Sequence, residues 1–340
     1  MSYNSSMKTE IKSIAIVRLS ALGDIINSAI VLQFIHHFYP NTTIDWITEE
    51  VFSPLLQEHP LLNKVHTLNI KQIKKERDFK ALKQTIRKLR LLPEYDIIID
   101  MQGLIKSAIV ARLIGKNTHG FDKHSTRESL ASFLYKTSSS IPYETSVVKR
   151  NCFVVADALD FHISDTMILN KKAIFPVEQN FTLRSDVKNI ALVIGASWES
   201  KIYPKELLAE LCQELNEQFY IIWGNEKEKE TAEWIMQKAS NATLAPKLPL
   251  NILVSFVSSM DLLIGNDTGP THIAWAQNIP SITLFGPTNE RMIYETPQNI
   301  ALNSPSKVNI LKIDKNDFSI KDIPIKAILD KAKELLKYGI

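Results

Sequence analysis

Cysteine is scarce in this chain of 340 residues, which contains only Cys152 and Cys212 and no Cys-x-x-Cys spacing. So few cysteines argue against a disulfide framework and against a cysteine metal site. Neither Gly-x-Gly-x-x-Gly nor Gly-x-x-x-x-Gly-Lys-Ser/Thr occurs, which argues against a dinucleotide-dependent dehydrogenase and a P-loop ATPase. Asp-x-Asp is missing as well. An enzyme that holds a nucleotide sugar through a divalent metal would be expected to carry that motif, so cationic side chains and helix ends are expected to take its place.

Long apolar runs and a strong excess of charge are also missing. No run of about 18 apolar residues occurs, so we expect no membrane-spanning helix. Residues 1–10 are polar and lack the apolar core of a signal peptide. We therefore expect a cytoplasmic protein, whose net charge of +3 is small for its length. With 45% hydrophobic residues, the chain is long enough for about two domains.

Strand-like and helix-like stretches alternate along both halves of the chain. Strands are predicted at 14–17, 43–48 and 96–102, a helix over 24–38, and further strands near 189, 220, 261 and 281. This alternation predicts an α/β fold with parallel sheets covered by helices, in two doubly wound, Rossmann-like domains that face each other. We expect the domains at 1–175 and 176–320, with a final amphipathic helix in 321–340 that packs back on the first domain.

The stretch "GNDTGPTHIA" in the second half is the most informative candidate site. Ligands of open α/β sheets bind beyond the carboxyl ends of the strands, where this loop lies. Asp267 and Thr268 stand between two glycines, and Gly269 precedes Pro270, which begins a helix. The free N–H groups and the dipole of a helix N-terminus suit a phosphate, although Asp267 alone would also serve as a cap. His272, one turn later, adds more polar chemistry than a cap needs.

Two other loops at the same edge carry charged residues. "GASWESK" offers Ser197 and Lys201 just before a helix, and Lys201 there either binds a phosphate or is simply solvated. Glu226 follows the strand "YIIW". An acid at that position commonly binds the sugar hydroxyls of a nucleotide, but a glutamate in a first helical turn is also favoured by the helix dipole. The residues alone leave both alternatives open.

Asp24 lies at a strand-to-helix turn in the first half, within "RLSALGD". A lone aspartate at a helix start is usually an N-cap. Gly23 frees the backbone before it, and Arg18 and Ser20 make the loop polar at a strand end, which favours a ligand role.

Basic residues gather in the first half. Residues 71–90 hold nine Lys or Arg against two acids, which is usual for a solvated helix but also attracts an anionic partner or an acidic membrane surface. Further basic residues of this half are Lys106, Lys123, His124, Arg127, Lys149 and Arg150, and together they predict an acidic acceptor.

Five stretches together resemble the lipopolysaccharide heptosyltransferases, over nearly the whole chain. They are "IVRLSALGDIINS", "DMQGLIKSA", "STRESLASFLY", "WGNEKEKE" and "GNDTGPTHIAWAQNIPSITLFGPT". The resemblance implies a GT-B fold with two domains across a cleft, and an inverting transfer without metal or other cofactor. It implies the donor ADP-L-glycero-β-D-manno-heptose in the carboxyl-terminal domain and the acceptor Kdo of Kdo2-lipid A in the amino-terminal domain. The enzyme would then work at the cytoplasmic face of the inner membrane as a peripheral protein.

The resemblance also implies roles for single residues. Asp24 matches the general base, Lys201 the lysine on the donor phosphate, and Glu226 the acid on the ribose. The remaining donor residues would be Gly23, Ser197, Asp267, Thr268, Gly269 and His272, and the acceptor residues Lys71, Lys74, Lys75, Lys106, Arg127 and Arg150. The chain departs from some relatives, which have arginine at the position of Lys71 and histidine at the position of Ser146. Those two changes put the details of acceptor contact in doubt.

Other functions stay open from the sequence. A heptosyltransferase that adds to an existing heptose would carry the same donor motifs, and a sugar-nucleotide epimerase of the same fold is more distant. The run at 71–90 also suits a nucleotide-binding module with a basic nucleic-acid face. That run contains Phe79 as its only aromatic residue, so stacking on bases is not indicated and we expect no nucleic-acid partner.

Overall fold

The computed structural model of the chain describes residues 11–337, which fall into two compact units. Unit 1 contains the residues up to Ser20 with 31–143 and 152–163, and unit 2 contains 21–30, 144–151 and the residues from Ser164 onward. Each unit has one six-stranded sheet in which all paired strands are parallel. The predicted pair of doubly wound sheets is therefore confirmed.

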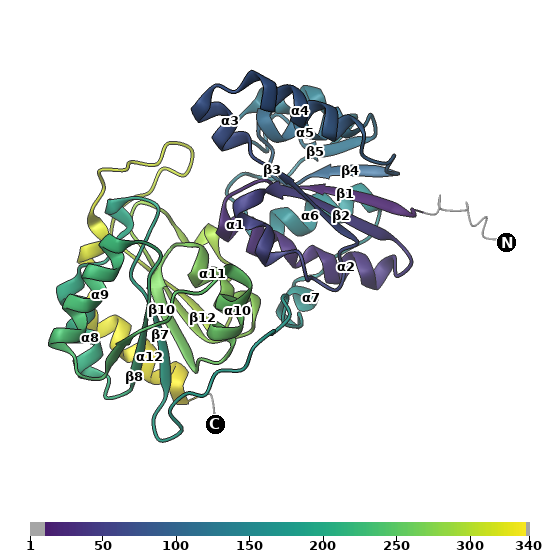
Figure 1. Ribbon diagram of the computed structural model, residues 1–340. Helices are drawn as coiled ribbons and strands as arrows, with labels where there is room; N and C mark the ends of the chain where they lie inside the picture. Colours follow the sequence, from purple (N-terminus) through teal and green to yellow (C-terminus); the bar gives the residue numbers. More distant parts are fainter. Residues whose placement is uncertain (1–10, 338–340) are drawn as a thin grey trace. The chain divides into compact units, whose positions relative to one another are not determined.

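The sheet of unit 1 has the strand order β3-β2-β1-β4-β5-β6. Its elements are β1 (Ser13–Val17), α2 (Val31–Phe38), β2 (Thr43–Glu49), η1 (Glu50–Leu55), β3 (Lys64–Leu68), α3 (Ile70–Glu76), α4 (Phe79–Arg90), β4 (Ile97–Asp100), α5 (Ile105–Ile114), β5 (Thr118–Phe121), η2 (Ser129–Leu134) and β6 (Thr137–Ser139). Helix α2 covers one face of this sheet and helices α4 and α5 cover the other (Figure 1). The central strand β1 is consequently an uninterrupted apolar run, fully buried from Ile14 to Val17.

The helix expected over 24–38 is divided into two. Helix α1 spans Leu22–Ala29 and helix α2 spans Val31–Phe38, with a turn at Ile30 between them. The division reflects packing, because α1 is grouped with unit 2 while α2 stays with unit 1. Helix α1 packs against α11 (Gly269–Ala276) of unit 2. The expectation of one continuous helix is thus wrong.

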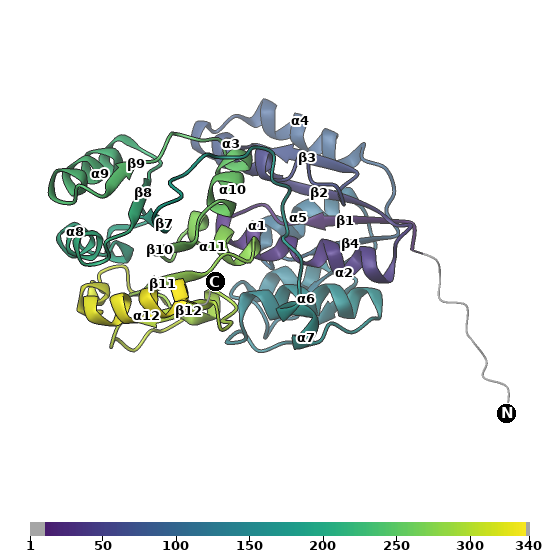
Figure 2. The same cartoon turned by 90° about the horizontal axis from the view of Figure 1, so that it is seen from below.

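The sheet of unit 2 has the order β12-β11-β10-β7-β8-β9. Its elements, besides α1 and α11, are α7 (Asp165–Leu169), β7 (Asn189–Val193), η3 (Glu199–Lys201), α8 (Lys205–Glu214), β8 (Gln218–Ile222), α9 (Glu226–Lys238), β9 (Ala242–Leu244), α10 (Leu250–Ser258), β10 (Leu262–Asn266), β11 (Ser281–Phe285), η4 (Glu290–Met292), β12 (Asn299–Asn303), η5 (Ser319–Asp322) and α12 (Ile325–Lys337). Helices α8, α9 and α12 lie on one face of the sheet and α10 and α11 on the other (Figures 1 and 2). Helix α6 (Val147–Leu159) contains residues of both units.

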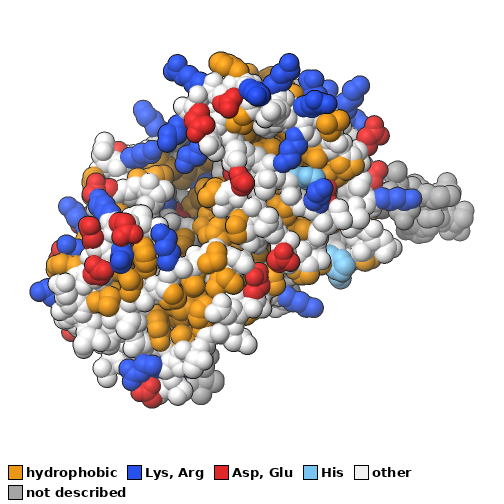
Figure 3. All heavy atoms as spheres, in the orientation of Figure 1, with side chains coloured by type: hydrophobic (Ala, Val, Ile, Leu, Met, Phe, Trp, Pro, Cys, Tyr) orange, Lys and Arg blue, Asp and Glu red, His pale blue; other side chains and the backbone are white. Residues whose placement is uncertain are grey.

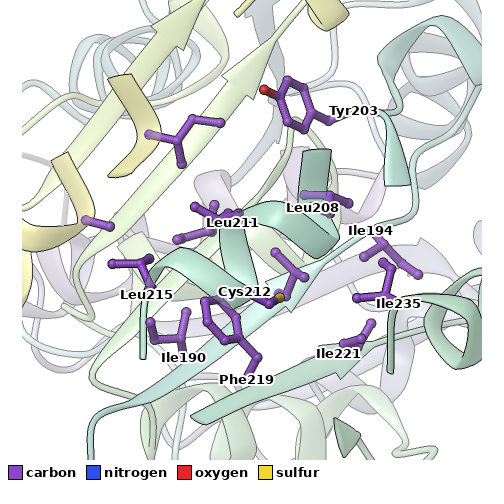
Figure 4. Packing of buried hydrophobic residues seen from close by; sticks show 14 of the residues in the cluster. Ile190, Ile194, Tyr203, Leu208, Leu211, Cys212, Leu215, Phe219, Ile221 and Ile235 are labelled. Atoms are coloured by element: carbon purple, nitrogen blue, oxygen red, sulfur yellow. The ribbon is translucent and has the colours of Figure 1, made fainter. Parts of the chain in front are cut away.

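One apolar core lies between the sheet of unit 2 and helices α8, α9 and α12. Leu208, Leu211 and Phe219 pack at its centre (Figure 4). Helix α12 adds Ile328 and Leu335, both buried in the same cluster. The final helix was expected to pack back on the first domain. That expectation is wrong, because the buried residues of α12 complete the core of unit 2.

Candidate functional site

Four loops of unit 2 leave the carboxyl ends of neighbouring parallel strands and so meet at one edge of the sheet. They follow β7, β8, β10 and β11 at residues 194–198, 223–225, 267–268 and 286–289. Crevices at this edge are where open α/β sheets bind their ligands. Most donor candidates of the sequence lie in the first three loops or directly after them. The structure brings Lys201, which follows the first loop, into contact with Asp267 of the third, and Asp267 into contact with Thr288 of the fourth.

Asp267 is the centre of that contact. Its Oδ2 atom accepts hydrogen bonds from Lys201 Nζ at 2.6 Å and from Thr288 Oγ1 at 2.8 Å. Its Oδ1 atom lies 3.3 Å from His272 Nε2. All four side chains are buried. Burial alone would favour the neutral acid, but the Lys201 charge and the His272 contact outweigh it and hold the pKa of Asp267 well below its ordinary value.

Thr288 is a site residue that the sequence did not single out. It comes from "FGPT", the loop after β11, which the sequence marked only as a tight turn. Its hydroxyl shares one carboxylate oxygen with Lys201, and this fixes the rotamer of Asp267. The carboxylate therefore holds the lysine of one loop to the threonine of another, across the edge where the phosphate is expected.

Helix α1 reaches the same cluster through Asn27. The Asn27 Nδ2 atom donates to the Met292 carbonyl at 3.0 Å and lies 3.4 Å from His272 Nδ1. With Nδ1 as acceptor, the proton of the imidazole is on Nε2, which then donates to Asp267. Asn27 is buried, and its role was not visible in the sequence because 245 residues separate it from His272.

Gly23 allows α1 to approach α11 closely. A Cβ atom at Gly23 would lie only 2.4 Å from His272 Cδ2, so no larger residue fits without displacing the imidazole. Asp24 is the next residue, in the first turn of α1, and is partly exposed. Its carboxylate accepts a hydrogen bond from the Ala21 N–H at 3.2 Å. The candidate base therefore caps its own helix and lies one residue from the contact with His272.

The loop after β7 contains polar atoms whose partners are missing from the described part of the chain. The indole N–H of Trp198 and the hydroxyl of Ser200 are buried there without a hydrogen bond. Buried polar atoms are nearly always paired, so these two atoms are exceptions among the described residues. Lys201 Nζ also lies 5.0 Å from the centre of the Trp198 ring, a cation–π distance. Ser197, by contrast, is exposed on this loop.

Two glutamates at the start of α9, directly after the loop that follows β8, are candidates for the expected contact with a ribose. Glu226, the expected residue, is exposed at the start of α9. Glu228 instead accepts hydrogen bonds from Gly224 N–H at 2.7 Å and Asn225 Nδ2 at 2.8 Å. A Cβ atom at Gly195 would lie 2.4 Å from its carboxylate, so Glu228 faces the glycine loop after β7 directly. Glu228, and not the exposed Glu226, is therefore the glutamate whose carboxylate faces the loop after β7.

Five of the six cations expected at the acceptor lie at the corresponding edge of unit 1. They follow β3, β4 and β5, are all exposed, and are Lys71, Lys74 and Lys75 on α3, Lys106 on α5 and Arg127 in the loop before η2. Lys106 Nζ donates to Ser20 Oγ at 3.2 Å, in the loop after β1. Arg150 is not part of this group, because it is buried in α6 and grouped with unit 2.

Solved structures with this arrangement of two parallel sheets include glycosyltransferases. The Escherichia coli heptosyltransferase WaaC with ADP-2-deoxy-2-fluoro heptose matches with a TM-score of 0.78 and 22% identity, over 95% of this chain and 99% of that one. The E. coli ADP-heptose lipopolysaccharide heptosyltransferase II matches with a TM-score of 0.66 and 20% identity, over 96% and 99% of the two chains. The chain thus has the GT-B fold of these two enzymes.

The chain belongs to glycosyltransferase family 9, the heptosyltransferases, whose family model matches residues 81–317. It is 39% identical to lipopolysaccharide heptosyltransferase 1 of Campylobacter coli, over 95% of this chain and 98% of the relative. It is 28% identical to the protein of the same name from Pseudomonas aeruginosa, over 81% and 79% of the two chains. The resemblance drawn from five short stretches is confirmed.

Proposed function

We propose that this enzyme transfers L-glycero-D-manno-heptose from ADP-heptose to the Kdo of Kdo2-lipid A, inverting the anomeric centre without a metal. The full-length similarity to heptosyltransferase 1 of C. coli at 39% identity supports this acceptor. Similarity to lipooligosaccharide heptosyltransferase 2 of Haemophilus influenzae is lower, at 25% identity over 95% of the chain. Addition to an existing heptose is therefore the second candidate.

Donor binding is assigned to unit 2. The N-terminus of α11, at Gly269, would receive the diphosphate, because free N–H groups and the helix dipole favour negative charge there. Thr268 and Ser197 would line the same site. Lys201 is held beside it by Asp267 and would stabilise the charge that grows on the leaving ADP. Glu228 would accept hydrogen bonds from the ribose hydroxyls.

Asp24 is assigned the role of general base. It would accept the proton of the Kdo hydroxyl as that oxygen attacks the anomeric carbon, while the bond from that carbon to ADP breaks on the opposite side. A single displacement of this kind needs one carboxylate near the attacking oxygen. The observation that supports the assignment is the close approach of Gly23, the residue before Asp24, to His272 on α11.

The test is a product assay with ADP-heptose and Kdo2-lipid A, run with and without chelator and repeated with an acceptor that already carries heptose. Transfer only to the heptosylated acceptor would select the second candidate, and loss of activity with chelator would contradict the metal-free mechanism. Asp24→Asn is expected to lower turnover by about 10²–10⁴ while the fold is kept. Asp78→Asn is the matched control, because Asp78 also accepts a backbone hydrogen bond at a helix start, from Ala81 N–H at 2.9 Å.

The ribose assignment is tested by two neighbouring substitutions. Glu228→Gln is expected to raise the KM for ADP-heptose about tenfold or more, the typical effect of weakening charged hydrogen bonds, with a smaller change in kcat. Glu226→Gln, in the same helical turn, should leave KM nearly unchanged. The opposite pattern would return the role to Glu226.

Acceptor binding is assigned to unit 1, through Lys71, Lys74, Lys75, Lys106 and Arg127, with the phosphates and carboxylates of Kdo2-lipid A as their counterions. Arg150 would act from unit 2. We place the enzyme at the cytoplasmic face of the inner membrane, where its acceptor is anchored. No helix within residues 11–337 has the length and apolar character to cross a bilayer, so attachment would be peripheral. A filter-binding assay, expected to be negative, tests the remaining nucleic-acid alternative.

A further inference from the structure

Six large apolar side chains of unit 1 are exposed on three neighbouring elements. Helix α4 packs against α5, and α5 packs against η2. Phe79 on α4 and Phe133 on η2 are the most exposed, at 80% and 76%. We call this surface the docking face, and its apolar members are Phe79, Leu82, Ile105, Ile109, Leu130 and Phe133.

The apolar residues follow the helical repeat. On α4, Phe79, Leu82 and the partly exposed Ile86 are spaced i, i+3 and i+7, which places them on one side of the helix. On α5, Ile105 and Ile109 are one turn apart and share a side as well. Exposed apolar side chains therefore form a row on each of two helices that pack together, which is more than the single scattered apolar residues of an ordinary protein surface.

Positive charge predominates around these rows, although Asp78 precedes α4 and Glu128 precedes η2. Helices α4 and α5 together contain seven Lys or Arg and no Asp or Glu. Blue side chains are frequent on the part of the surface that carries α3 and α4, with apolar atoms and a few red side chains among them (Figure 3). The seven cations are Lys80, Lys83, Arg87, Lys88, Arg90, Lys106 and Arg112.

The docking face begins at the carboxyl edge of the sheet. Helix α5 and the loop to η2 follow β4 and β5, and the helix pair α3–α4 follows β3. A helix that follows a parallel strand starts at that edge, and Ile105 therefore lies beside Lys106; its N–H also donates to Glu128, the residue after Arg127, at 2.7 Å. A partner on the docking face would thus be next to the residues assigned to the acceptor.

We propose that the docking face inserts its apolar side chains into the interfacial region of an anionic lipid membrane, with the surrounding cations on the headgroups. This rests on the proposed function, because it takes the lipid part of the acceptor to stay in the bilayer. Apolar residues flanked by Lys and Arg are the composition of peripheral membrane-binding helices. A second copy of the chain suits this surface poorly, since a symmetric pair would bring two sets of seven cations together.

The proposal differs from attraction by charge alone, because it assigns part of the binding to Phe79 and Phe133. Binding to vesicles should then weaken with salt but not vanish, since insertion of apolar side chains does not depend on screening. Phosphatidylcholine vesicles with and without phosphatidylglycerol separate the two contributions. The full-length protein is sedimented with each kind of vesicle at low and high salt.

The decisive variant is Phe79→Ser combined with Phe133→Ser. It is expected to bind phosphatidylglycerol-containing vesicles at least about tenfold more weakly, from the transfer free energy of two phenylalanines. Leu169→Ser is the matched control, because Leu169 lies on α7 of unit 2 and is 50% exposed. It should bind like the wild type. The two single Phe variants are measured as well, so that a folding defect of the double variant leaves the comparison intact.

Catalysis is measured in parallel on Kdo2-lipid A in vesicles and on a deacylated, water-soluble form of the acceptor. The double variant should lose activity on vesicles and keep it on the soluble acceptor. Vesicle binding equal to that of the wild type, or a wild-type dimer that the double variant abolishes, would overturn the proposal. If the wild type transfers heptose to the soluble acceptor but does not bind vesicles, the membrane role of the docking face is refuted and the proposed function is kept. If the wild type binds vesicles but transfers no heptose to either acceptor, the proposed function is refuted and the membrane role of the docking face is kept.

Discussion

Replacement of Asp267 by Asn is expected to destabilise unit 2 strongly. The carboxylate is buried, with only 2% of its side chain exposed, and Lys201 beside it is 9% exposed. Asp267→Asn leaves the ammonium without its counterion at 2.6 Å. Removal of one member of a buried ion pair typically costs about 3–5 kcal/mol. We expect about 3 kcal/mol here, because the Asn side-chain oxygen still accepts a hydrogen bond, which corresponds to a decrease in Tm of about 6–12 °C.

The assay is thermal and urea unfolding of the wild type, Asp267→Asn, Lys201→Met and the double variant. The double variant should recover part of the loss, since it leaves no unpaired buried charge. Asp330→Asn is the control, because Asp330 pairs with Lys326 at 2.8 Å on the exposed side of α12 and should have almost no effect. An Asp267→Asn protein within about 1 kcal/mol of the wild type, or single effects that simply add, would refute the reasoning.

The pH dependence gives a second readout of the same pair. The pKa of Asp267 is lowered by folding, so its contribution is present above the ordinary value of 3.8 and is lost as the pH falls through the lower folded value. The difference in unfolding free energy between the wild type and Asp267→Asn should therefore narrow below about pH 4. A difference that stays constant between pH 7 and pH 3 would show that the charge of Asp267 contributes little.

Two further substitutions test other contacts of unit 2. Gly23→Ala should push the new methyl group into His272, destabilise the protein by about 1–3 kcal/mol and lower turnover more than substrate affinity; unchanged kinetics would contradict the close approach of α1. Burial lowers the pKa of Lys171 from 10.5 to about 7, so between these values the unfolded chain binds more protons and stability rises with pH. The slope from this residue is at most about 1.4 kcal/mol per pH unit, and urea titrations of Lys171→Met should lack it.

The central strands could be read from the sequence because they are buried on both faces. The runs at 14–17 and 43–48 correspond to β1 and β2. The short strands β9 and β12 could not be read in this way. Strand β9 has three residues, and β12 reads Asn-Ile-Ala-Leu-Asn, with polar residues at both ends. Edge strands of this kind exist because a neighbouring strand pairs with them, and local pattern does not record that.

The sequence predicts those parts of the candidate site that lie within a single loop, and it does not predict contacts between loops. The helix start at Gly269 is signalled locally by glycine and proline. The ion pair of Lys201 with Asp267 joins residues 66 positions apart, and Thr288 comes from a third loop, so their contact depends on the order of strands in the sheet. The choice between Glu226 and Glu228 depends on where α9 begins, which is after Asn225 as N-cap. The sequence does not mark this start clearly, because the charged residues of "EKEKE" give no apolar periodicity.

The position of α12 bears on how the protein is made. Its Ile328, Ala332 and Leu335 belong to a core whose other members begin at Ile190, so the core of unit 2 is incomplete until residue 335 has been synthesised. During translation the apolar faces of α8 and of the sheet therefore remain uncovered while most of the chain already exists. Segments left open in this way are recognised by chaperones and are prone to aggregate. Shortening the protein before α12 would make that transient exposure permanent.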